Sequence, residues 1–226
     1  MNLSGARILV TGASGALGGR IARNLCDNGS RLCVSGRNGE RLRAIAAELD
    51  ASSMPGDLRE VGAAMDIVDA AVEHLGGLDG VVHAAGVVAF GPMDDLSDAT
   101  LAELVEVNLM APIRLTRAAA SRLAEGGVIV SLSAVVATIP TAGMAAYSAV
   151  KAGLTAFDQA AGRELRRRGI RLLDVCPPHT ATGLETRPIA GTAPKLPPGR
   201  DPDEIVARIV AAMRDDTARA VSFDDR

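Results

Sequence analysis

RILVTGASGALG, residues 7–18, is the stretch that decides the fold of this chain. It starts as a short apolar run, which predicts a buried strand at 7–11, and it passes through glycines into a helical pattern that reaches about Asp27. Gly12 permits a tight turn, Gly15 lets a ligand approach the backbone, and Gly18 lets the helix pack closely on the sheet. The amide groups at the start of such a helix bind a pyrophosphate. We therefore predict a nucleotide-binding turn, formed by Gly12, Ser14, Gly15, Ala16, Leu17 and Gly18.

Strands and helices alternate along the rest of the chain, which predicts an α/β fold. Apolar runs predict further strands at 31–35, 51–55, 78–83, 127–133, 170–175 and 219–223, and the segments between them predict helices at 39–49, 60–75, 98–124, 147–168 and 203–214. This alternation gives a doubly wound parallel sheet, or Rossmann fold, of about seven strands with helices on both faces. Right-handed crossovers place the ligand at the carboxyl ends of the strands. We expect one domain over 1–226, with a substrate-side loop at about 182–202 that is rich in proline, glycine and threonine.

Composition narrows the classes of function. The chain has 48% hydrophobic but only 2% aromatic residues, so its core is built from small aliphatic side chains. A net charge of −3 offers no basic surface for nucleic acid. The sequence shows neither a signal-peptide pattern nor an apolar run long enough to span a membrane, so we expect a cytoplasmic protein. Cys26, Cys33 and Cys176 lack metal-ligand spacing, and we expect no metal.

The end of the second predicted strand indicates which nucleotide binds. An NAD site usually places a carboxylate there for the ribose 2′-hydroxyl. This chain has Gly36 and Arg37 instead. An arginine pairs with a 2′-phosphate, which favours NADP(H) over NADH, although Arg37 could also stand on a solvated helix start.

A second motif, Tyr147 followed four residues later by Lys151, carries the candidate chemistry. Tyr147 is the only tyrosine of the chain. Residues four apart share one helix face, so the phenol and the ammonium reach the same volume. A nearby ammonium favours phenolate, so we expect the pKa of Tyr147 to fall from about 10 and make it a general acid or base. A buried helix with one aromatic and one lysine is the alternative.

The order and spacing of these motifs resemble the short-chain dehydrogenase/reductase family over roughly residues 5–215. The matching pieces are the glycine turn at 11–18, Asp57, the strand end Ala84-Ala85-Gly86, Asn108, the strand serines Ser131 and Ser133, the pair Tyr147 and Lys151, and the proline turn at Pro177.

The resemblance implies hydride transfer between NADP(H) and a carbonyl or alcohol carbon. Tyr147 would exchange a proton with the substrate oxygen, Lys151 would bind the nicotinamide ribose, and Asn108 would hold a water that relays protons. Asn108 could instead be an amide bonded to helix backbone. The remaining cofactor contacts that the resemblance implies are Asp57, Leu58, Ala84, Ala85, Gly86, Pro177, Thr180 and Thr182.

The chain departs from the family pattern at the catalytic serine. Thirteen residues before Tyr147 the family places a serine, and this chain has Ala134. Ser133 precedes it, and we predict that a bulge or turn aims its hydroxyl at the substrate, with a buried serine bonded to backbone as the alternative. His83 and Ala84 replace asparagines common in the family, and we expect His83 to be structural. His179 follows the sixth strand, close to the expected nicotinamide.

Two functions remain open at this point. The first is an NADP(H)-dependent oxidoreductase for a small apolar substrate, because the segments expected to line the pocket are small and apolar. The second is a catalytically weak NADP(H)-binding sensor, which Ala134 motivates. An epimerase or dehydratase with a tightly held cofactor is a third and weaker alternative. The resemblance also implies a homodimer or homotetramer.

Overall fold

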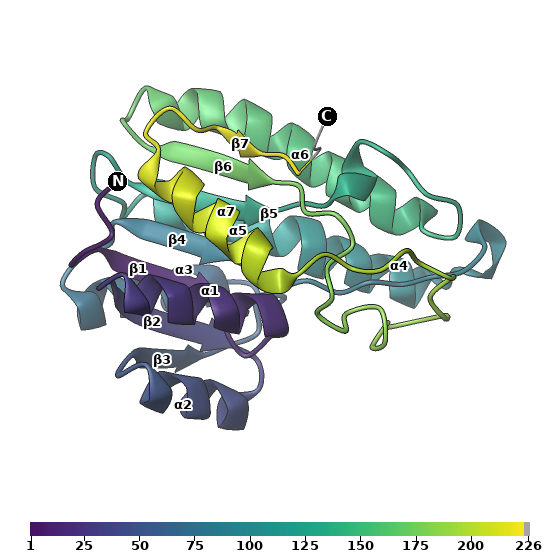
Figure 1. Ribbon diagram of the computed structural model, residues 1–226, viewed down its shortest axis with the longest axis horizontal. Helices are drawn as coiled ribbons and strands as arrows, with labels where there is room; N and C mark the ends of the chain where they lie inside the picture. Colours follow the sequence, from purple (N-terminus) through teal and green to yellow (C-terminus); the bar gives the residue numbers. More distant parts are fainter. Residues whose placement is uncertain (224–226) are drawn as a thin grey trace.

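A seven-stranded sheet, parallel throughout, forms the centre of the computed structural model, which describes residues 1–223 (Figure 1). The strands lie in the order β3-β2-β1-β4-β5-β6-β7. Their bounds are β1 Arg7–Thr11, β2 Arg31–Gly36, β3 Ser52–Pro55, β4 Gly80–His83, β5 Val128–Leu132, β6 Arg171–Val175 and β7 Ala220–Val221. The direction of winding reverses between β1 and β4, which is where a doubly wound sheet binds its ligand.

Helices cover both faces of the sheet (Figure 1). One layer holds α1 (Ala16–Asp27), α2 (Gly39–Glu48) and α7 (Pro202–Arg214). The other layer holds α3 (Ala63–Leu75), α5 (Ala111–Ala120) and α6 (Ala145–Arg166), and α4 (Asp98–Val105) precedes α5. Within residues 1–223, no helix combines the length and the apolarity needed to cross a membrane.

Alternation along each strand builds two apolar layers from one sheet. In β1, Ile8 and Val10 pack among the side chains of α1, α2 and α7, whereas Leu9 packs among those of α3 and α5. Successive side chains of a strand point to opposite faces, so a strand buried on both sides must be apolar throughout. This constraint explains why the β1 sequence reads as a continuous aliphatic run.

The predicted doubly wound fold is confirmed, but the helix expected at 98–124 is not continuous. A π-helical turn, Glu106–Met110, separates α4 from α5 and contains Asn108, and α5 ends at Ala120. Pro112 follows this turn and has no backbone N–H, so the α-helical bond from residue 112 to the carbonyl of Asn108 cannot form. Wide turns of this kind are frequent at functional sites.

The glycine turn is as tight as its sequence predicts. Gly12 has a φ of 73°, and a Cβ atom there would lie 2.5 Å from the backbone nitrogen of Ala85. A Cβ atom at Gly18 would overlap the carbonyl oxygen of Gly12. The loops after β1 and β4 therefore touch backbone to backbone, and only glycine allows this contact.

A row of polar side chains crosses the sheet near the ends of its central strands. Thr11, His83, Ser131 and Asp174 are neighbours in register across β1, β4, β5 and β6. Residues in register point to one face, and these lie two positions beyond buried aliphatic residues on the face that α3, α5 and α6 cover. We refer to these four residues as the polar row.

Two glycine substitutions test the packing of the turn. Gly18→Ala should lower the free energy of unfolding by about 1–3 kcal/mol, because its methyl group overlaps the Gly12 carbonyl. Gly162→Ala in α6 should raise it by about 0.5–1 kcal/mol, because its Cβ would lie 3.7 Å from Leu172 and alanine favours a helix. Urea unfolding measures both, and an unchanged stability of Gly18→Ala would contradict the packing described.

Candidate active site

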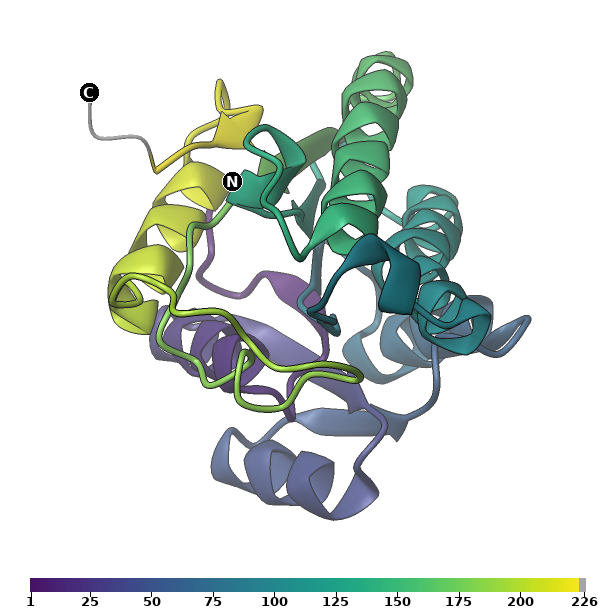
Figure 2. The same cartoon turned by 90° about the vertical axis from the view of Figure 1, so that its right-hand side faces the viewer.

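The carboxyl ends of the strands carry the candidate site, and the segment after β6 crosses in front of them (Figure 2). This segment is tied down by backbone contacts. Ala89 bridges to Ala190, and the Phe90 N–H donates to the Ala190 carbonyl at 3.0 Å. Its two stems are held together by a bridge between Thr180 and Arg200. The loop predicted at 182–202 therefore lies over the site as an ordered cover.

Tyr147 and Lys151 stand in the first two turns of α6 and are both buried. Their exposed fractions are 8% and 4%, and the Lys151 Nζ lies 5.8 Å from the centroid of the Tyr147 ring. Lys151 donates a hydrogen bond of 2.8 Å from Nζ to the carbonyl of Leu132 at the end of β5. This bond fixes the ammonium between α6 and the sheet.

Burial dominates the acidity of both groups, and here the sequence-based expectation for Tyr147 is wrong. Burial raises the pKa of Tyr147 to about 12, whereas the sequence predicted a fall. Burial lowers the pKa of Lys151 to about 8, and the carboxylate charges of Asp158 and Asp174 act in the opposite direction. The ammonium does not offset the loss of hydration of a phenolate at this site, so Tyr147 is held in its protonated form.

Asn108 is fully buried and its amide is committed to backbone. Its Nδ2 donates to the carbonyls of Val87 at 3.0 Å and Leu104 at 3.1 Å, and its Oδ1 accepts from the Val87 N–H at 3.2 Å. These bonds fasten the chain after β4 to the π-helical turn. A relay water would have to bind the Asn108 carbonyl, which Pro112 deprives of its helical donor.

The structure does not support the substrate role predicted for Ser133. Its Oγ donates to Asp174 Oδ1 at 2.5 Å and to the Val175 carbonyl at 3.1 Å, and it lies 3.0 Å from Cys176 Sγ. All of these partners belong to β6 and the residue after it. The expected bulge that would turn the hydroxyl is absent here, because Ser133 still pairs with β6 through its N–H to the Val175 carbonyl.

Ala134, thirteen residues before Tyr147, lies near the phenol and carries no hydroxyl. Its side chain packs in the apolar cluster that contains Tyr147, Val136 and Met144. The second hydroxyl that the family places beside the tyrosine is thus replaced by a methyl group. His83 is structural as expected: it is buried, its Nδ1 lies 2.8 Å from Thr11 Oγ1, and burial lowers its pKa to about 3.

The glycine turn and the end of β2 form one continuous nucleotide surface. A Cβ atom at Gly36 would lie 2.8 Å from Ser14 Oγ, so the bare strand end lets the Ser14 hydroxyl lie against it, and a side chain there would require that hydroxyl to rotate away. Gly15 is exposed at the start of α1, with Ala16 and Leu17 partly buried behind it. Ala84 and Ala85 form the opposite wall, where the Gly12 backbone meets them.

Arg37 lies exposed beyond Gly36, and its charge helps to lower the pKa of Asp57. The larger cause is Arg59, which forms an ion pair of 2.6 Å with Asp57. Leu58 is buried beneath them. The structure therefore brings Arg37, Asp57 and Leu58 to one rim, with Asp57 already engaged by a cation.

The turn after β6 closes the site on the other side. The Pro177 carbonyl accepts from the Val135 N–H at 2.9 Å, and the Thr180 hydroxyl donates to the Pro178 carbonyl at 2.8 Å. The Thr182 hydroxyl donates to the Thr180 carbonyl at 3.4 Å.

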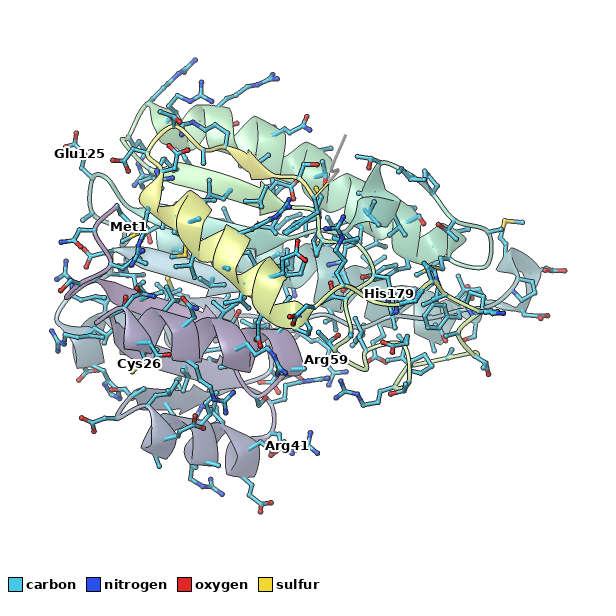
Figure 3. The ribbon with its side chains drawn as sticks, viewed as in Figure 1. Met1, Cys26, Arg41, Arg59, Glu125 and His179 are labelled. Carbon is cyan, nitrogen blue, oxygen red and sulfur yellow. The ribbon has the colours of Figure 1, made fainter. Side chains whose placement is uncertain are left out.

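His179 lies at this end of the molecule, far from Met1 and Glu125 at the opposite end (Figure 3). Gly86, expected at the same edge, is exposed, and a Cβ atom there would lie 3.1 Å from Asn108 Oδ1.

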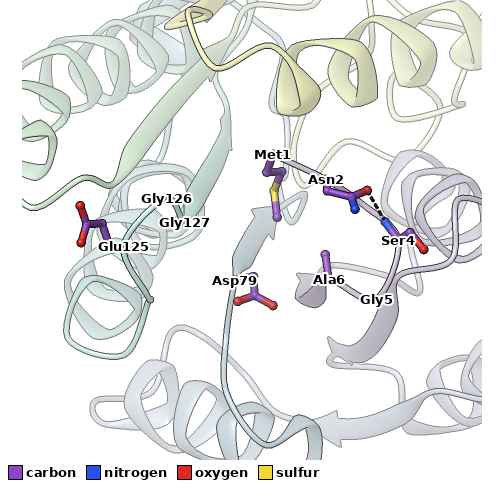
Figure 4. Close-up of a pocket in the computed structure, with 9 residues that line it drawn as sticks. All are labelled: Met1, Asn2, Ser4, Gly5, Ala6, Asp79, Glu125, Gly126 and Gly127. Carbon is purple, nitrogen blue, oxygen red and sulfur yellow. Dashed lines mark hydrogen bonds between the residues drawn. The ribbon is translucent and has the colours of Figure 1, made fainter.

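Two cavities differ in their relation to this site. One, of about 290 Å³, is lined by residues such as Met1, Asp79 and Glu125 at the amino ends of the strands, and it touches none of the predicted site residues (Figure 4). The other, of about 300 Å³, runs from the glycine turn to α2, with Ser14 and Arg41 in its wall. Arg41, in the wall of this second cavity, therefore places a positive charge near the glycine turn.

A phosphate-binding turn beside a buried phenol and ammonium defines a nucleotide-dependent oxidoreductase. The chain belongs to the short-chain dehydrogenase family, whose sequence model matches residues 6–190. Family and enzyme class are therefore confirmed, and members of this family use NAD or NADP.

Relatives and solved structures agree with this membership. An uncharacterized oxidoreductase of Methylorubrum extorquens is 32% identical over 97% of this chain and 94% of its own length. A candidate ketoacyl reductase of Streptomyces coelicolor is 36% identical over 78% of this chain and 71% of its own. A short-chain dehydrogenase of Burkholderia cenocepacia, solved in complex with NADP, is 31% identical, covers 97% of this chain and 96% of its own, and has a TM-score of 0.87.

The acidity of Tyr147 can be measured directly, because the chain has one tyrosine and no tryptophan. Near-ultraviolet absorbance of the folded protein should show no phenolate at pH values where free tyrosine, with a pKa of about 10, ionises. Because the folded pKa is raised, this group stabilises the fold below pH 10 and loses that contribution as the pH approaches 12. Phenolate absorbance below pH 10, with unchanged circular dichroism, would contradict the burial effect.

Proposed function

We propose that the protein is an NADPH-dependent reductase of small apolar carbonyl compounds. The observation that carries the proposal is the buried pair Tyr147 and Lys151, which lies at the same sheet edge as a glycine turn whose neighbouring strand end, Gly36, carries no carboxylate. The fold and the family account for hydride transfer in general. The cofactor preference and the substrate rest on this chain's own residues.

The preference for NADPH follows from the rim around Gly36. The missing side chain leaves space beside Ser14, and Arg37 and Arg41 border that space on the α2 side. A 2′-phosphate would accept from the Ser14 hydroxyl and pair with these guanidinium groups. Bound NADPH would supply the hydride, and the Gly12–Gly18 turn would hold its pyrophosphate.

Tyr147 acts as the general acid of the reduction. Its raised pKa keeps the phenol protonated at neutral pH, which is the form that donates a proton to a carbonyl oxygen as negative charge develops there. Lys151, held by the Leu132 carbonyl, places a positive charge beside the phenol and stabilises the phenolate that this transfer leaves. The Asn108 carbonyl, which lacks its α-helical donor because residue 112 is proline, would accept a hydrogen bond from a water that returns a proton.

The surroundings of Tyr147 favour an apolar substrate. Val88, Phe90 and Met144 pack around it, and Leu184 and Ile189 of the covering loop close the same cluster. Such a lining offers little compensation for a buried charge, so it selects against ionic substrates. A homo-oligomer, as the family resemblance implies, is part of the same proposal.

A catalytically weak NADP(H)-binding sensor is the second candidate, and one observation favours it. Ala134 leaves the substrate oxygen without the hydroxyl that would share its developing charge, and Ser133 is bonded to Asp174 instead. The loss of one such donor typically costs a factor of about 10²–10³ in rate. Turnover therefore separates the two candidates.

Substitution of Tyr147 tests the reductase. Purified protein is mixed with NADPH and a panel of aldehydes, ketones, quinones and ketoacyl esters, and the absorbance of the reduced cofactor is followed. Tyr147→Phe should lower kcat by about 10²-fold or more and leave the Kd for NADPH unchanged, because only the proton donor is lost. Tight NADPH binding without turnover of any compound by the unmodified protein would favour the sensor.

Substitution of Arg37 tests the cofactor preference. Arg37→Ala should weaken NADPH binding by about tenfold while leaving the Kd for NADH nearly unchanged, because only NADPH carries the 2′-phosphate. Arg31→Ala, an exposed arginine at the far end of β2, is the matched control. An equal loss of affinity for both nucleotides would refute the role of Arg37.

A further inference from the structure

A second set of buried polar and ionisable groups lies between α6 and the sheet, near Lys151, and it has no part in the proposed reduction. Asp174 and Ser131 of the polar row are neighbours on β6 and β5, and Asp174 binds Ser133. Cys176 Sγ lies 3.6 Å from the other Asp174 oxygen. The sheet therefore presents a carboxylate and a thiol to α6 at the level of Lys151.

Asp158 is the α6 residue that faces this set. It follows Lys151 by seven residues, which places both side chains on one helix face. Asp158 is 2% exposed, and neither of its carboxyl oxygens has a hydrogen-bond partner among the residues that the structure describes. The Ser131 hydroxyl, also without a partner within residues 1–223, is close enough to lower the pKa of Asp158.

Charge balance explains why an unbonded carboxyl persists there. Burial raises the pKa of Asp158 to about 8 and the Asp174 charge adds to the rise, whereas Lys151 lowers it. Asp158 acts on Lys151 in turn: of the charges that raise the pKa of Lys151, its carboxylate has the largest effect. Two carboxylates and one ammonium away from water carry an excess negative charge, which a retained proton removes.

We propose that Asp158 is a positioning residue of the active site, whose carboxyl releases its proton in place of Lys151 and so keeps the lysine ammonium charged at alkaline pH. As the pH rises, the first proton leaves Asp158 for solvent, and the negative charge of the resulting carboxylate favours the charged form of Lys151. The ammonium that stabilises the Tyr147 phenolate then persists to a higher pH. The catalytic part of this inference rests on the proposed reductase function.

The other groups around Lys151 do not take over this role. His83 of β4 is neutral, because burial holds its pKa at about 3. Burial raises the pKa of Cys176 to about 11, so the thiol stays protonated through the relevant range. Tyr147 on α6 is likewise protonated. Asp174 of β6 already accepts from Ser133, and Asp158 is the carboxyl without such a bond.

Lysine titration tests the proposal without reference to activity. The chain contains only two lysines, Lys151 and the exposed Lys195, so a protein labelled at the lysine ε-carbon gives two side-chain signals by NMR. In Asp158→Asn, the pKa of Lys151 should fall by at least about one pH unit, because an opposite charge is removed. Lys195 should not move, and Asp66→Asn, an exposed carboxylate on α3, should move neither signal.

Two further measurements complete the test. If Asp158→Asn does not fold, Asp158→Thr removes the carboxyl with a similar volume and should show the same shift, whereas Asp158→Glu should restore the original titration. For the active enzyme, the alkaline limb of kcat/KM should move to lower pH in Asp158→Asn by the same amount, with unchanged values on the acid side.

An unchanged Lys151 titration in the neutral variants would overturn the proposal, and so would a loss of rate that is equal at every pH. If no compound is turned over by the unmodified protein, the reductase proposal fails, and the titration still decides whether Asp158 controls the charge of Lys151.

Discussion

The burial of a single ammonium group organises the candidate site. Lys151 is almost out of contact with water, and the hydrogen bond to the Leu132 carbonyl accounts for one of its three donors. A charge in such surroundings is costly unless dipoles and counter-charges are fixed around it. β5 supplies the carbonyl, β6 supplies Asp174, and the same face of α6, two turns further on, supplies Asp158. The same helix holds Tyr147 beside this charge, with Nζ 5.8 Å from the centroid of the phenol ring.

The same strands of the sheet contribute residues to the hydrophobic core and to the candidate active site. In the two positions before the polar row, the side chains of these strands are aliphatic and pack against helices on both faces. At the polar row the face beneath α5 and α6 becomes hydrogen-bonding, with Thr11 and His83 paired and Ser131 and Asp174 beside them. On each of these strands, a core residue and a polar-row residue therefore lie only two positions apart. The close packing of the core residue keeps the polar side chain rigidly in place.

The sequence was sufficient for the fold and for the principal pair, because glycine spacing, strand–helix alternation and a four-residue helical spacing are local patterns. It failed where the result depends on three-dimensional surroundings. The direction of the Tyr147 pKa shift required the degree of burial. The aim of the Ser133 hydroxyl required the register with β6. The sequence analysis missed Asp158, although an acidic residue seven positions after Lys151 on a buried helix face was a visible signal. Pro112 was likewise a visible signal for the break in the helix that contains Asn108.

The covering loop is attached to the rest of the molecule by very few backbone bonds. Ile189 donates to Val88, Phe90 donates to Ala190, and Arg200 closes the stem against His179. Each bond of this kind contributes only about 0.5–1.5 kcal/mol, and Leu184 and Ile189 add apolar contacts with the cluster around Tyr147. All of these contacts lie outside the ladders of the seven-stranded sheet. An opening of the loop would therefore be a local equilibrium, distinct from global unfolding, and would set the rate at which reactants exchange with solvent.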